Sequence, residues 1–442
     1  MDAREVALLT LNACQRQGGW SDGVLKKQLA AAGLDSRDAA LATQLCFGVV
    51  QNQLLLDFYL SGFSNIPLKR MEGKVVQALR LGAYQLLFMD KIPHSAAVNS
   101  CVDLVKRHCK NQRAVGMVNA VLRSLERSLD NLPVIPSADP VSYLSILYSH
   151  PEWLVKEYLL TLDEGEVDRL LAAHNSQPPM TAMVNTTKVT QEALVGELTA
   201  NGVEVSLHPW LSNCLQLSKT GNLESLRSFQ EGWFYVQDPA SRLAIQALEP
   251  KAGERVLDCC AAPGGKTFAC AIAVNGEGEV VSCDLHPHKK KLIQAGADRL
   301  GLSCVKPHTV DAREFRPEWE SAFDRVLVDA PCSGLGVIRK KPDIRFKQPE
   351  QLDALPAIQR DILDNACRYV KPGGVLVYST CTVRKGENEG VAEDFLSRHP
   401  EFEAVPFVLP GPVGACESGM VTLWPHRHGT DGFFISKFRK KE

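Results

Sequence analysis

Two stretches of the chain end an apolar run with a cysteine. Residues 323–336 read FDRVLVDAPCSGLG, so a hydrophobic strand leads into Asp329, a proline and Cys332. Residues 375–383 read VLVYSTCTV, and a second apolar strand leads into Cys381. A thiolate is a strong nucleophile. Two thiols at the ends of two strands therefore raise the question of a shared catalytic site.

Alternating strand and helix patterns fill the chain from about residue 233 onward. Short apolar strands are predicted at 255–260, 279–285, 305–311, 324–330 and 374–380, with helices between most of them. This alternation is typical of a parallel, doubly wound sheet. Ligands of such sheets bind beyond the carboxyl ends of the strands. Both cysteines follow strand ends, so we expect them in a ligand site.

The first of these strands leads into a glycine turn, DCCAAPGGKT at 258–267. Glycines let the backbone approach a ligand closely, and a helix start offers free N–H groups. The spacing differs from the dinucleotide fingerprint, and position 260 is a cysteine where a phosphate-binding loop has its first glycine. The predicted cofactor contacts in this turn are Cys260, Ala261, Ala262, Pro263, Gly264, Gly265 and Lys266.

Two aspartates end the next two strands. Asp284 follows the glycines at about the 20-residue distance at which an acid can bind both ribose hydroxyls. Asp311 ends the third strand, where it can accept from an adenine amino group. A glycine turn with a ribose acid and an adenine acid, without a phosphate clamp, describes S-adenosylmethionine. Taken singly, each aspartate has a structural alternative as a helix cap or a loop acid.

The remaining sequence predicts two further domains. Apolar residues at three- and four-residue spacing predict helices through 1–128, for which an all-α bundle is the natural packing. The proline-containing stretch 130–140 reads as a linker, and 141–232 mixes helices with short strands. We expect an all-α domain at 1–130, a small α+β domain at 141–232, and a Rossmann-like α/β domain at 233–442.

Composition limits the class of protein. The 442 residues are 45% hydrophobic and 23% charged, which is typical of multidomain globular proteins. No apolar run approaches the roughly 18 residues that span a bilayer, and the N-terminus lacks a signal-peptide pattern. We therefore expect a cytoplasmic protein without a membrane partner. The 14 cysteines include no CxxC pair, so no metal is expected. Nothing demands more than a monomer.

Three motifs, DCCAAPGGKT, DAPCSG and STCT in this order, resemble those of the NOL1/NOP2/Sun family of RNA cytosine-C5 methyltransferases. Residues 38–60 and 79–125 resemble the NusB-like domain of its RsmB branch, also called Sun or Fmu, which modifies 16S ribosomal RNA. The resemblance covers nearly the whole chain. It implies S-adenosylmethionine as cofactor and 16S rRNA, naked or in a partly assembled small subunit, as partner.

The resemblance also implies roles for four side chains. Cys381 is the implied nucleophile, because a thiolate that adds to carbon 6 of cytosine activates carbon 5. Cys332 is implied to assist proton removal and release. Asp329 is expected at the cytosine N3/N4 edge and near the cofactor, and Lys266 beside the thiols and the methionine part of the cofactor. Buttressing of the turn and a helix start are the structural alternatives for these last two.

Basic residues after the second motif predict RNA contacts. The stretch VIRKKPDIRFK at 337–347 holds five bases in eleven positions, so phosphate contacts are expected for Arg339, Lys340, Lys341 and Arg345. The stretch MVNTTK at 183–188 resembles a family element in which Asn185 and Lys188 match, although Met183 stands in the place of an arginine. These two matching residues are also expected to contact RNA.

Three features near the catalytic sheet and two other functions complete the predictions. Asp238-Pro239 reads as a helix N-cap followed by proline. In HRHGTDGFF at 426–434, His428, Gly429 and Asp431 are expected near the pocket, before a core strand with Phe433 and Phe434. Cytosine-C5 methylation of tRNA stays open, as does an RNA-binding assembly factor with vestigial catalysis. The target nucleotide is not readable from the chain.

Overall fold

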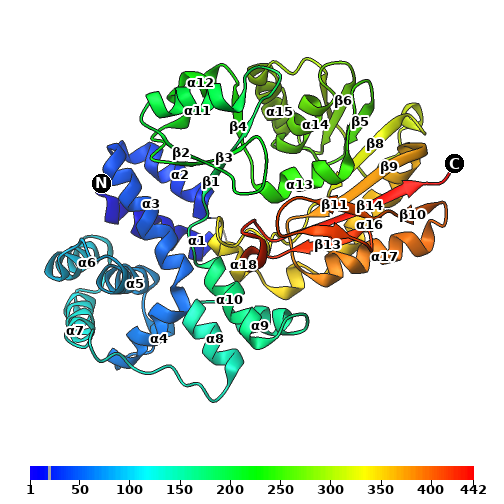
Figure 1. The fold of residues 1–442 in the computed structure, drawn as a ribbon. Helices are drawn as coiled ribbons and strands as arrows, with labels where there is room; N and C mark the ends of the chain where they lie inside the picture. The colour runs from blue at the N-terminus through cyan, green and yellow to red at the C-terminus, as the bar shows by residue number, and fades with distance from the viewer. Residues whose placement is uncertain (18–20) are drawn as a thin grey trace. The chain divides into compact units, whose positions relative to one another are not determined.

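The computed structural model describes residues 1–17 and 21–442. The chain forms two compact units. Unit 1 contains Met1–Ser176 and Ile338–Lys347, and unit 2 contains Gln177–Val337 and Gln348–Glu442. The second segment of unit 1 therefore interrupts unit 2 shortly after the DAPCSG motif. Figure 1 shows the elements of both units in chain order.

Unit 1 is built from helices in its described residues. Its first seven are α1 (Ala3–Gln17), α2 (Ser21–Ala32), α3 (Ser36–Gln51), α4 (Gln53–Phe63), α5 (Gly73–Phe88), α6 (His94–His108) and α7 (Arg113–Arg127). Helix α5 is central, since most of its side chains are buried. The predicted all-α domain is confirmed. Helices α3 and α4 are separate, because the Asn52 side chain and N–H both donate to Gly48 O and end α3.

Three further helices belong to unit 1: α8 (Pro140–Tyr148), α9 (Glu152–Leu159) and α10 (Glu164–His174). The sequence placed them at the start of the middle domain. Buried hydrogen bonds explain the grouping: Leu55 N donates to Ser149 Oγ at 3.1 Å, and Gln51 Nε2 donates to Asn175 O. Both bonds join the α3–α4 region to the ends of the later helices.

Unit 2 begins with a four-stranded antiparallel sheet in the order β2-β3-β1-β4. Its strands are β1 (Met180–Val184), β2 (Glu204–Leu207), β3 (Cys214–Ser218) and β4 (Phe234–Val236), with α11 (Gln191–Ala200) and α12 (Arg227–Gln230). The predicted α+β character is confirmed. Strand β3 was not predicted, because its five residues carry only a short apolar pattern between turn-forming residues.

The larger sheet has the order β10-β14-β9-β8-β5-β6-β7, with β13 paired to β14. The five predicted strands are confirmed as β5 (Arg255–Asp258), β6 (Glu279–Asp284), β7 (Val305–Thr309), β8 (Phe323–Asp329) and β9 (Val370–Thr380), all parallel. An antiparallel edge adds β10 (Phe402–Ala404), β13 (Met420–Leu423) and β14 (Phe433–Lys440). The predicted core strand at Phe433 and Phe434 is β14, with both side chains buried.

Helices cover both faces of this sheet (Figure 1). Neighbouring strand residues alternate between two cores: Val280 packs with α13 (Pro239–Leu248), α14 (Gly265–Ala273) and α15 (Pro287–Leu300), while Val281 packs with α16 (Leu355–Ala366) and α17 (Glu389–Arg398). This period-two alternation is the expected pattern of a sheet buried on both sides. A short hairpin, β11 (Phe407–Leu409) with β12 (Gly414–Cys416), and a single-turn helix, α18 (Pro425–His428), complete unit 2.

The described residues contain no single helix that is both long and apolar enough to cross a membrane. The bent pair α3 and α4 meets the test of length and composition only when both helices are taken together.

Candidate active site

The register of the parallel sheet brings the two thiols together. Strands β8 and β9 are neighbours, with Asp329 opposite Ser379, and Ala330 N donates to Ser379 O at 2.9 Å. The chain runs on from each strand by a few residues, and the Sγ atoms of Cys332 and Cys381 lie 3.2 Å apart. The sequence suggested two strand-end cysteines; the pairing of their strands makes them one site.

The pKa values of the two thiols are shifted in opposite directions. The hydrogen bond from Cys332 lowers the pKa of Cys381, and the nearby Lys266 ammonium adds to this, while burial and Asp329 oppose it. The same hydrogen bond, followed by burial and the negative charge of Cys381, raises the pKa of Cys332 well above its usual value. The pair is therefore polarised toward a Cys381 thiolate that accepts a hydrogen bond from a Cys332 thiol.

Lys266 and Asp329 form an ion pair beside the thiols. Lys266 Nζ donates to Asp329 Oδ2 at 2.7 Å and to Ser241 Oγ at 3.2 Å, and Ser379 Oγ donates to Asp329 Oδ1 at 2.9 Å. Burial acts to lower the pKa of Lys266, but the Asp329 carboxylate outweighs it and the pKa is raised. Lys266 therefore stays a cation at neutral pH, close enough to stabilise a thiolate.

The glycine turn between β5 and α14 brings the backbone to the site. Gly264 has a φ of 115°, and a Cβ at this position would lie 2.4 Å from the Phe268 ring. Its N–H donates to Ala261 O, which closes the turn before α14 begins at Gly265. Only glycine satisfies both the backbone angle and the close approach of the ring.

A cavity of about 480 Å³ lies beyond the carboxyl ends of β5, β6, β7, β8 and β9. Its size is that of a site for a nucleoside-sized ligand. Its wall combines apolar groups with strand-end acids and both thiols, and the residues that line it include Cys260, Ala262, Asp284, Leu285, Val310, Asp311, Asp329, Pro331, Cys332 and Cys381. Seven of these residues are predicted cofactor or catalytic residues. The cavity fits S-adenosylmethionine, because its acids, its apolar wall and its tight turn match the hydroxyls, base and backbone contacts of that molecule.

The two predicted acids of this cavity have different surroundings. Asp284 is almost buried, accepts from His286 N at 3.1 Å, and lies 3.6 Å from Lys289 Nζ. Asp311 is held by Arg313, whose Nε and Nη2 donate at 3.0 and 2.6 Å. The hydrogen bond from Arg313 is also the main cause that lowers the pKa of Asp311. Asp311 must therefore share its carboxylate with Arg313 if it binds an adenine amino group.

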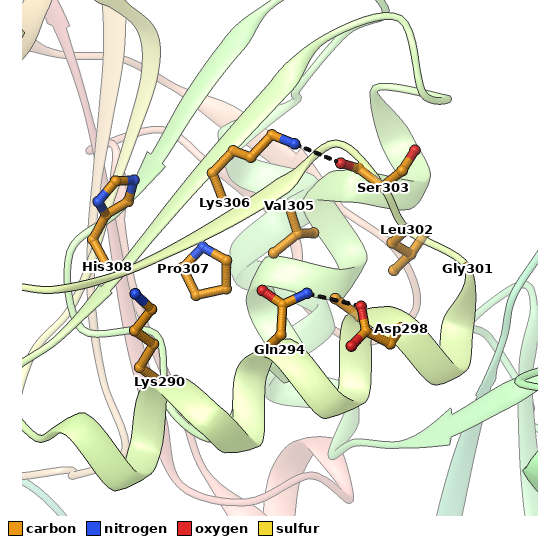
Figure 2. A pocket seen from close by; sticks show the side chains of 11 residues that line it. Lys290, Gln294, Asp298, Gly301, Leu302, Ser303, Val305, Lys306, Pro307 and His308 are labelled. Carbon is orange, nitrogen blue, oxygen red and sulfur yellow. Dashed lines mark hydrogen bonds between the residues drawn. The ribbon is translucent and has the colours of Figure 1, made fainter.

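A second cavity of about 670 Å³ lies along the edge strand β7 and helix α15. Figure 2 shows Lys290, Lys306 and His308 around Pro307, with Gln294 donating to Asp298 and Lys306 to Ser303. None of the strand-end acids or thiols lines it. This cavity is therefore separate from the candidate active site.

The structure gives the predicted RNA-binding residues different surroundings. Asn185 is fully buried, and its Nδ2 donates to Gly232 O and Leu300 O, each at 2.9 Å. Lys188 is exposed, but its Nζ donates to Glu231 O and Arg299 O at 2.7 and 3.2 Å. Both side chains thus bind carbonyls near the end of α15. The contacts explain these two residues without RNA.

Arg345 requires a correction as a predicted RNA contact. It is fully buried in unit 1, where Nη1 donates to the carbonyls of Gln51, Tyr148 and Ser149 and to Asn175 Oδ1 at 3.0–3.2 Å. A guanidinium is stabilised at helix carboxyl ends, and α3 and α8 both end here. In the same segment Lys340 and Lys341 are exposed and Arg339 is half-buried.

Several side chains that hold the site were not among the predicted residues. Asp258, at the end of β5, is fully buried, and burial raises its pKa to about 7. Its Oδ2 accepts from Thr267 Oγ1 at 2.7 Å. Ser241 and Ser379 orient the ion pair described above. The sequence offered a signal only for Asp258, which opens the glycine-turn motif.

The segment before β14 is bonded to the N-cap of α13. Asp238 caps α13 by accepting from Ala240 N, as predicted, and also accepts from Asp431 N at 3.1 Å. His428 Nδ1 accepts from Trp424 N at 2.8 Å. Asp431 influences the pKa of Cys381, so this segment reaches the electrostatic surroundings of the thiols.

One group of possible metal ligands occurs among the described residues, formed by Cys367, His399 and Glu401. Both ring nitrogens of His399 already lie within hydrogen-bond distance of carboxylates, Asp364 at 3.0 Å and Glu401 at 3.1 Å. These contacts account for the cluster as a hydrogen-bond network, so we assign no metal to it.

Three family models match successive parts of the chain. A model described as "16S rRNA methyltransferase RsmB/F" matches residues 245–439, a NusB family model matches 1–127, and a ferredoxin-like domain of the same methyltransferases matches 150–224. A Bacillus subtilis protein named as a probable ribosomal RNA small subunit methyltransferase B is 39% identical over 99% of this chain and 98% of its own. The chain belongs to the RsmB/F methyltransferase family.

A further relative and two solved structures are similar to this chain. Ribosomal RNA small subunit methyltransferase B of Vibrio cholerae is 36% identical over 92% of this chain and 90% of its own. The crystal structure of PH0851 matches with a TM-score of 0.82 and 28% identity over 100% of this chain and 99% of that one. A methyltransferase homologue from Pyrococcus horikoshii matches with a TM-score of 0.61 and 28% identity over 69% of this chain and 100% of that one.

Proposed function

We propose that this chain methylates carbon 5 of a cytosine in 16S rRNA, with S-adenosylmethionine as donor and a covalent bond between Cys381 and carbon 6. The observation that carries the proposal is the contact of the two thiols, 3.2 Å apart beside the ion pair of Lys266 and Asp329. Relatives named as ribosomal RNA small subunit methyltransferase B support the choice of rRNA.

The cofactor's place is the cavity beyond β5, β6 and β7. When bound there, S-adenosylmethionine supplies an electrophilic methyl group. Asp284 would take the ribose hydroxyls and the turn at Cys260 and Ala262 would take the methionine part. Leu285 and Val310 offer an apolar wall for the base. The almost complete burial of Asp284 makes its hydrogen bonds to a ligand strong.

Covalent addition begins the reaction on the RNA. The Cys381 thiolate attacks carbon 6 of cytosine, a carbon–sulfur bond forms, and the electrons of the C5–C6 double bond become available at carbon 5. Asp329 would accept from the cytosine N4 amino group, which favours cytosine over uracil. Lys266 stabilises the thiolate before attack and holds the Asp329 carboxylate by an ion pair.

Release requires loss of a proton from the methylated carbon 5. Once Cys381 is bonded to carbon 6, it no longer accepts the hydrogen bond that is the main cause of the raised pKa of Cys332. Cys332 can then give its own proton to solvent and act as the base for the carbon 5 proton. The C5–H electrons restore the double bond, the carbon–sulfur bond breaks, and Cys381 leaves as a thiolate.

The test is methyl transfer from labelled S-adenosylmethionine to unmodified 16S rRNA, with tRNA, DNA and the Cys381→Ala protein in parallel. Label in 16S rRNA, located at carbon 5 of a cytosine and absent with the variant, is the expected result. Label in tRNA alone would keep the chemistry and overturn the substrate. Absence of label in naked RNA and in partly assembled small subunits would favour a binding role without catalysis.

A further inference from the structure

A buried carboxylate beside the thiols takes no part in the steps above. Glu387 is fully buried in the 3-10 turn Lys385–Glu387, six residues after Cys381. Its Oε2 accepts from Ser333 N at 2.8 Å and from Gln359 Nε2 at 3.1 Å. Gln359 Nε2 also donates to Pro331 O at 3.0 Å. Glu387 therefore holds the backbone on both sides of Cys332.

The next residue, Asn388, holds the other thiol in the same way. Its Oδ1 accepts from Thr380 Oγ1 at 2.6 Å, and its Nδ2 donates to Thr382 O at 3.0 Å. Thr380 and Thr382 are the two neighbours of Cys381. Asn388 is also fully buried, so these hydrogen bonds do not compete with water.

Two further bonds join this pair to the sheet and join the loops to each other. Tyr378 OH, in β9, donates to Glu387 O at 2.6 Å. Ser333 Oγ and Thr382 Oγ1 lie 2.7 Å apart, and each residue follows one of the two cysteines. The hydrogen bonds thus form a closed network behind the thiols, with Glu387 and Asn388 at its centre.

We propose that Glu387 and Asn388 are positioning residues of the methyl-transfer site, and that together they keep Cys332 within hydrogen-bond distance of Cys381. The methyl transfer that these residues would assist is the proposed function, and this part of the inference rests on it. Their effect on the thiol pair itself does not depend on the substrate and can be measured without RNA.

The charge of Glu387 supports an electrostatic role in addition to its hydrogen bonds to the loop backbone. Among the described residues its Oε1 has no hydrogen-bond partner, although burying a carboxylate is costly. The negative charge of Glu387 also raises the pKa of Cys332, after the contributions of Cys381 and burial. Other charged groups facing the pair are Asp329, Lys266 and Asp431. Glu387 therefore favours the state in which Cys332 keeps its proton and donates to Cys381.

The experiment compares Glu387→Gln with Glu393→Gln in the full chain. Glu393 is exposed on α17, a few residues away, and its substitution removes the same charge. Iodoacetamide alkylation of Cys381 is followed across pH by peptide mass spectrometry, because alkylation reports the thiolate. For Glu387→Gln we expect the midpoint of alkylation to move to higher pH and single-turnover methyl transfer to fall at least tenfold. Glu393→Gln should match the wild-type protein.

Separate readouts distinguish positioning from loss of fold or of cofactor binding. Calorimetric titration should give an S-adenosylmethionine Kd within twofold of wild type for Glu387→Gln, with the RNA KM little changed and kcat lowered. A folded Glu387→Gln protein with the wild-type alkylation profile and kcat would overturn the inference. If wild-type protein methylates no RNA, the proposed function fails, while the alkylation profiles still decide whether Glu387 controls the thiols.

A second variant tests the same network if Glu387→Gln does not fold. Gln359→Met keeps the size of the side chain on α16 but removes the donor shared by Glu387 and Pro331. We expect the same direction of change in the Cys381 alkylation midpoint, and methyl transfer lowered about threefold. An unchanged midpoint in folded Gln359→Met would contradict the network's role in placing Cys332.

Discussion

The thiols of Cys332 and Cys381 are chemically similar in the sequence but unequal in the structure. Their mutual hydrogen bond lowers the pKa of Cys381 and raises that of Cys332, and Lys266 adds a positive charge on the side of Cys381. This polarity supports the proposed assignment of Cys381 as nucleophile, which the motifs alone left to family resemblance.

Cys332→Ala should separate addition from release. Cys381 keeps its access to carbon 6, but the base for the carbon 5 proton is lost, so the protein–RNA adduct should accumulate as a band stable in denaturing gels. Cys381→Ala should give no such band. Loss of the hydrogen bond also removes the main cause of the lowered Cys381 pKa, so adduct formation should shift to higher pH. An unshifted pH profile of adduct formation would contradict the lowered pKa of Cys381 in the thiol pair.

Lys266→Met should impair the same thiolate through charge. The variant removes a cation that lowers the pKa of Cys381 and leaves Asp329 with Ser379 as its remaining partner among those described here. We expect methyl transfer at pH 7 to fall about 100-fold, the usual scale for loss of a proton-controlling group, with partial recovery at higher pH. The pH dependence of single-turnover rates checks this, and equal loss at every pH would argue for cofactor binding instead.

Asp258 predicts a pH dependence of stability. Burial raises its folded-state pKa to about 7, above its unfolded value of 3.8, so the folded protein binds this proton more tightly. The carboxylate therefore destabilises the fold increasingly as pH rises from about 4 to 7, by up to about 4 kcal/mol. Asp258→Asn should raise Tm more at pH 8 than at pH 5 in calorimetric scans. Equal shifts at both pH values would rule out this linkage.

At the scale of elements, the site depends on where strands end and helices begin. Strands β5, β6 and β8 each end in an aspartate, and the parallel arrangement brings these ends to one edge. The turn at Gly264 then leads directly into α14, which places Lys266 in its first turn, where it pairs with Asp329. The cofactor cavity is thus made by the junctions between elements.

Gly264→Ala should weaken cofactor binding. The new Cβ would require both a positive φ and a contact at 2.4 Å with Phe268, so the turn must shift. Gly276→Ala is a matched control, because Gly276 also has a positive φ but nothing lies within 4 Å of a Cβ there. We expect an S-adenosylmethionine Kd at least tenfold higher for Gly264→Ala and unchanged for Gly276→Ala, by calorimetric titration. Equal Kd values would mean that the turn does not form the site.

At the scale of the whole molecule, the chain of the catalytic unit is not continuous. After Val337 it enters unit 1 for ten residues, Ile338–Lys347, and then returns to unit 2. Arg345 anchors this segment inside unit 1, and Phe346 packs against the helical core. The chain therefore crosses between the two units three times, whereas the predicted linker at 130–140 lies inside unit 1.

Arg345→Met should destabilise unit 1. The substitution keeps an unbranched apolar side chain but removes the donor that Arg345 supplies to three carbonyls and Asn175 Oδ1. We expect a loss of about 2–4 kcal/mol on the scale of buried hydrogen bonds. Urea denaturation of the full chain measures it, with Lys341→Met as an exposed control in the same segment. A stability equal to that of the control would contradict the anchoring role of Arg345.

The sequence alone determined what depends on local order along the chain. Strand and helix periodicity predicted the parallel sheet and the helical front, and motif order indicated the cofactor turn, the strand-end acids and both thiols. These features are set by neighbouring residues, because side-chain period and turn chemistry act over a few positions. The antiparallel strands β10 and β13 were not predicted, because they are only three and four residues long.

Only the tertiary structure decided which distant residues form hydrogen bonds with one another. The pairing of β8 with β9 turned two cysteines 49 residues apart into one polarised pair. Arg345 is buried inside unit 1, and Asn185 is buried and donates to Leu300 O at the end of α15, although the sequence predicted both as RNA contacts. Glu387 and Asn388 likewise lie behind the thiols, and Glu387 is held there by hydrogen bonds to residues distant in the chain. Burial and strand pairing arise from contacts between residues far apart in the chain. The sequence around a basic or polar residue therefore does not reveal its hydrogen-bond partner.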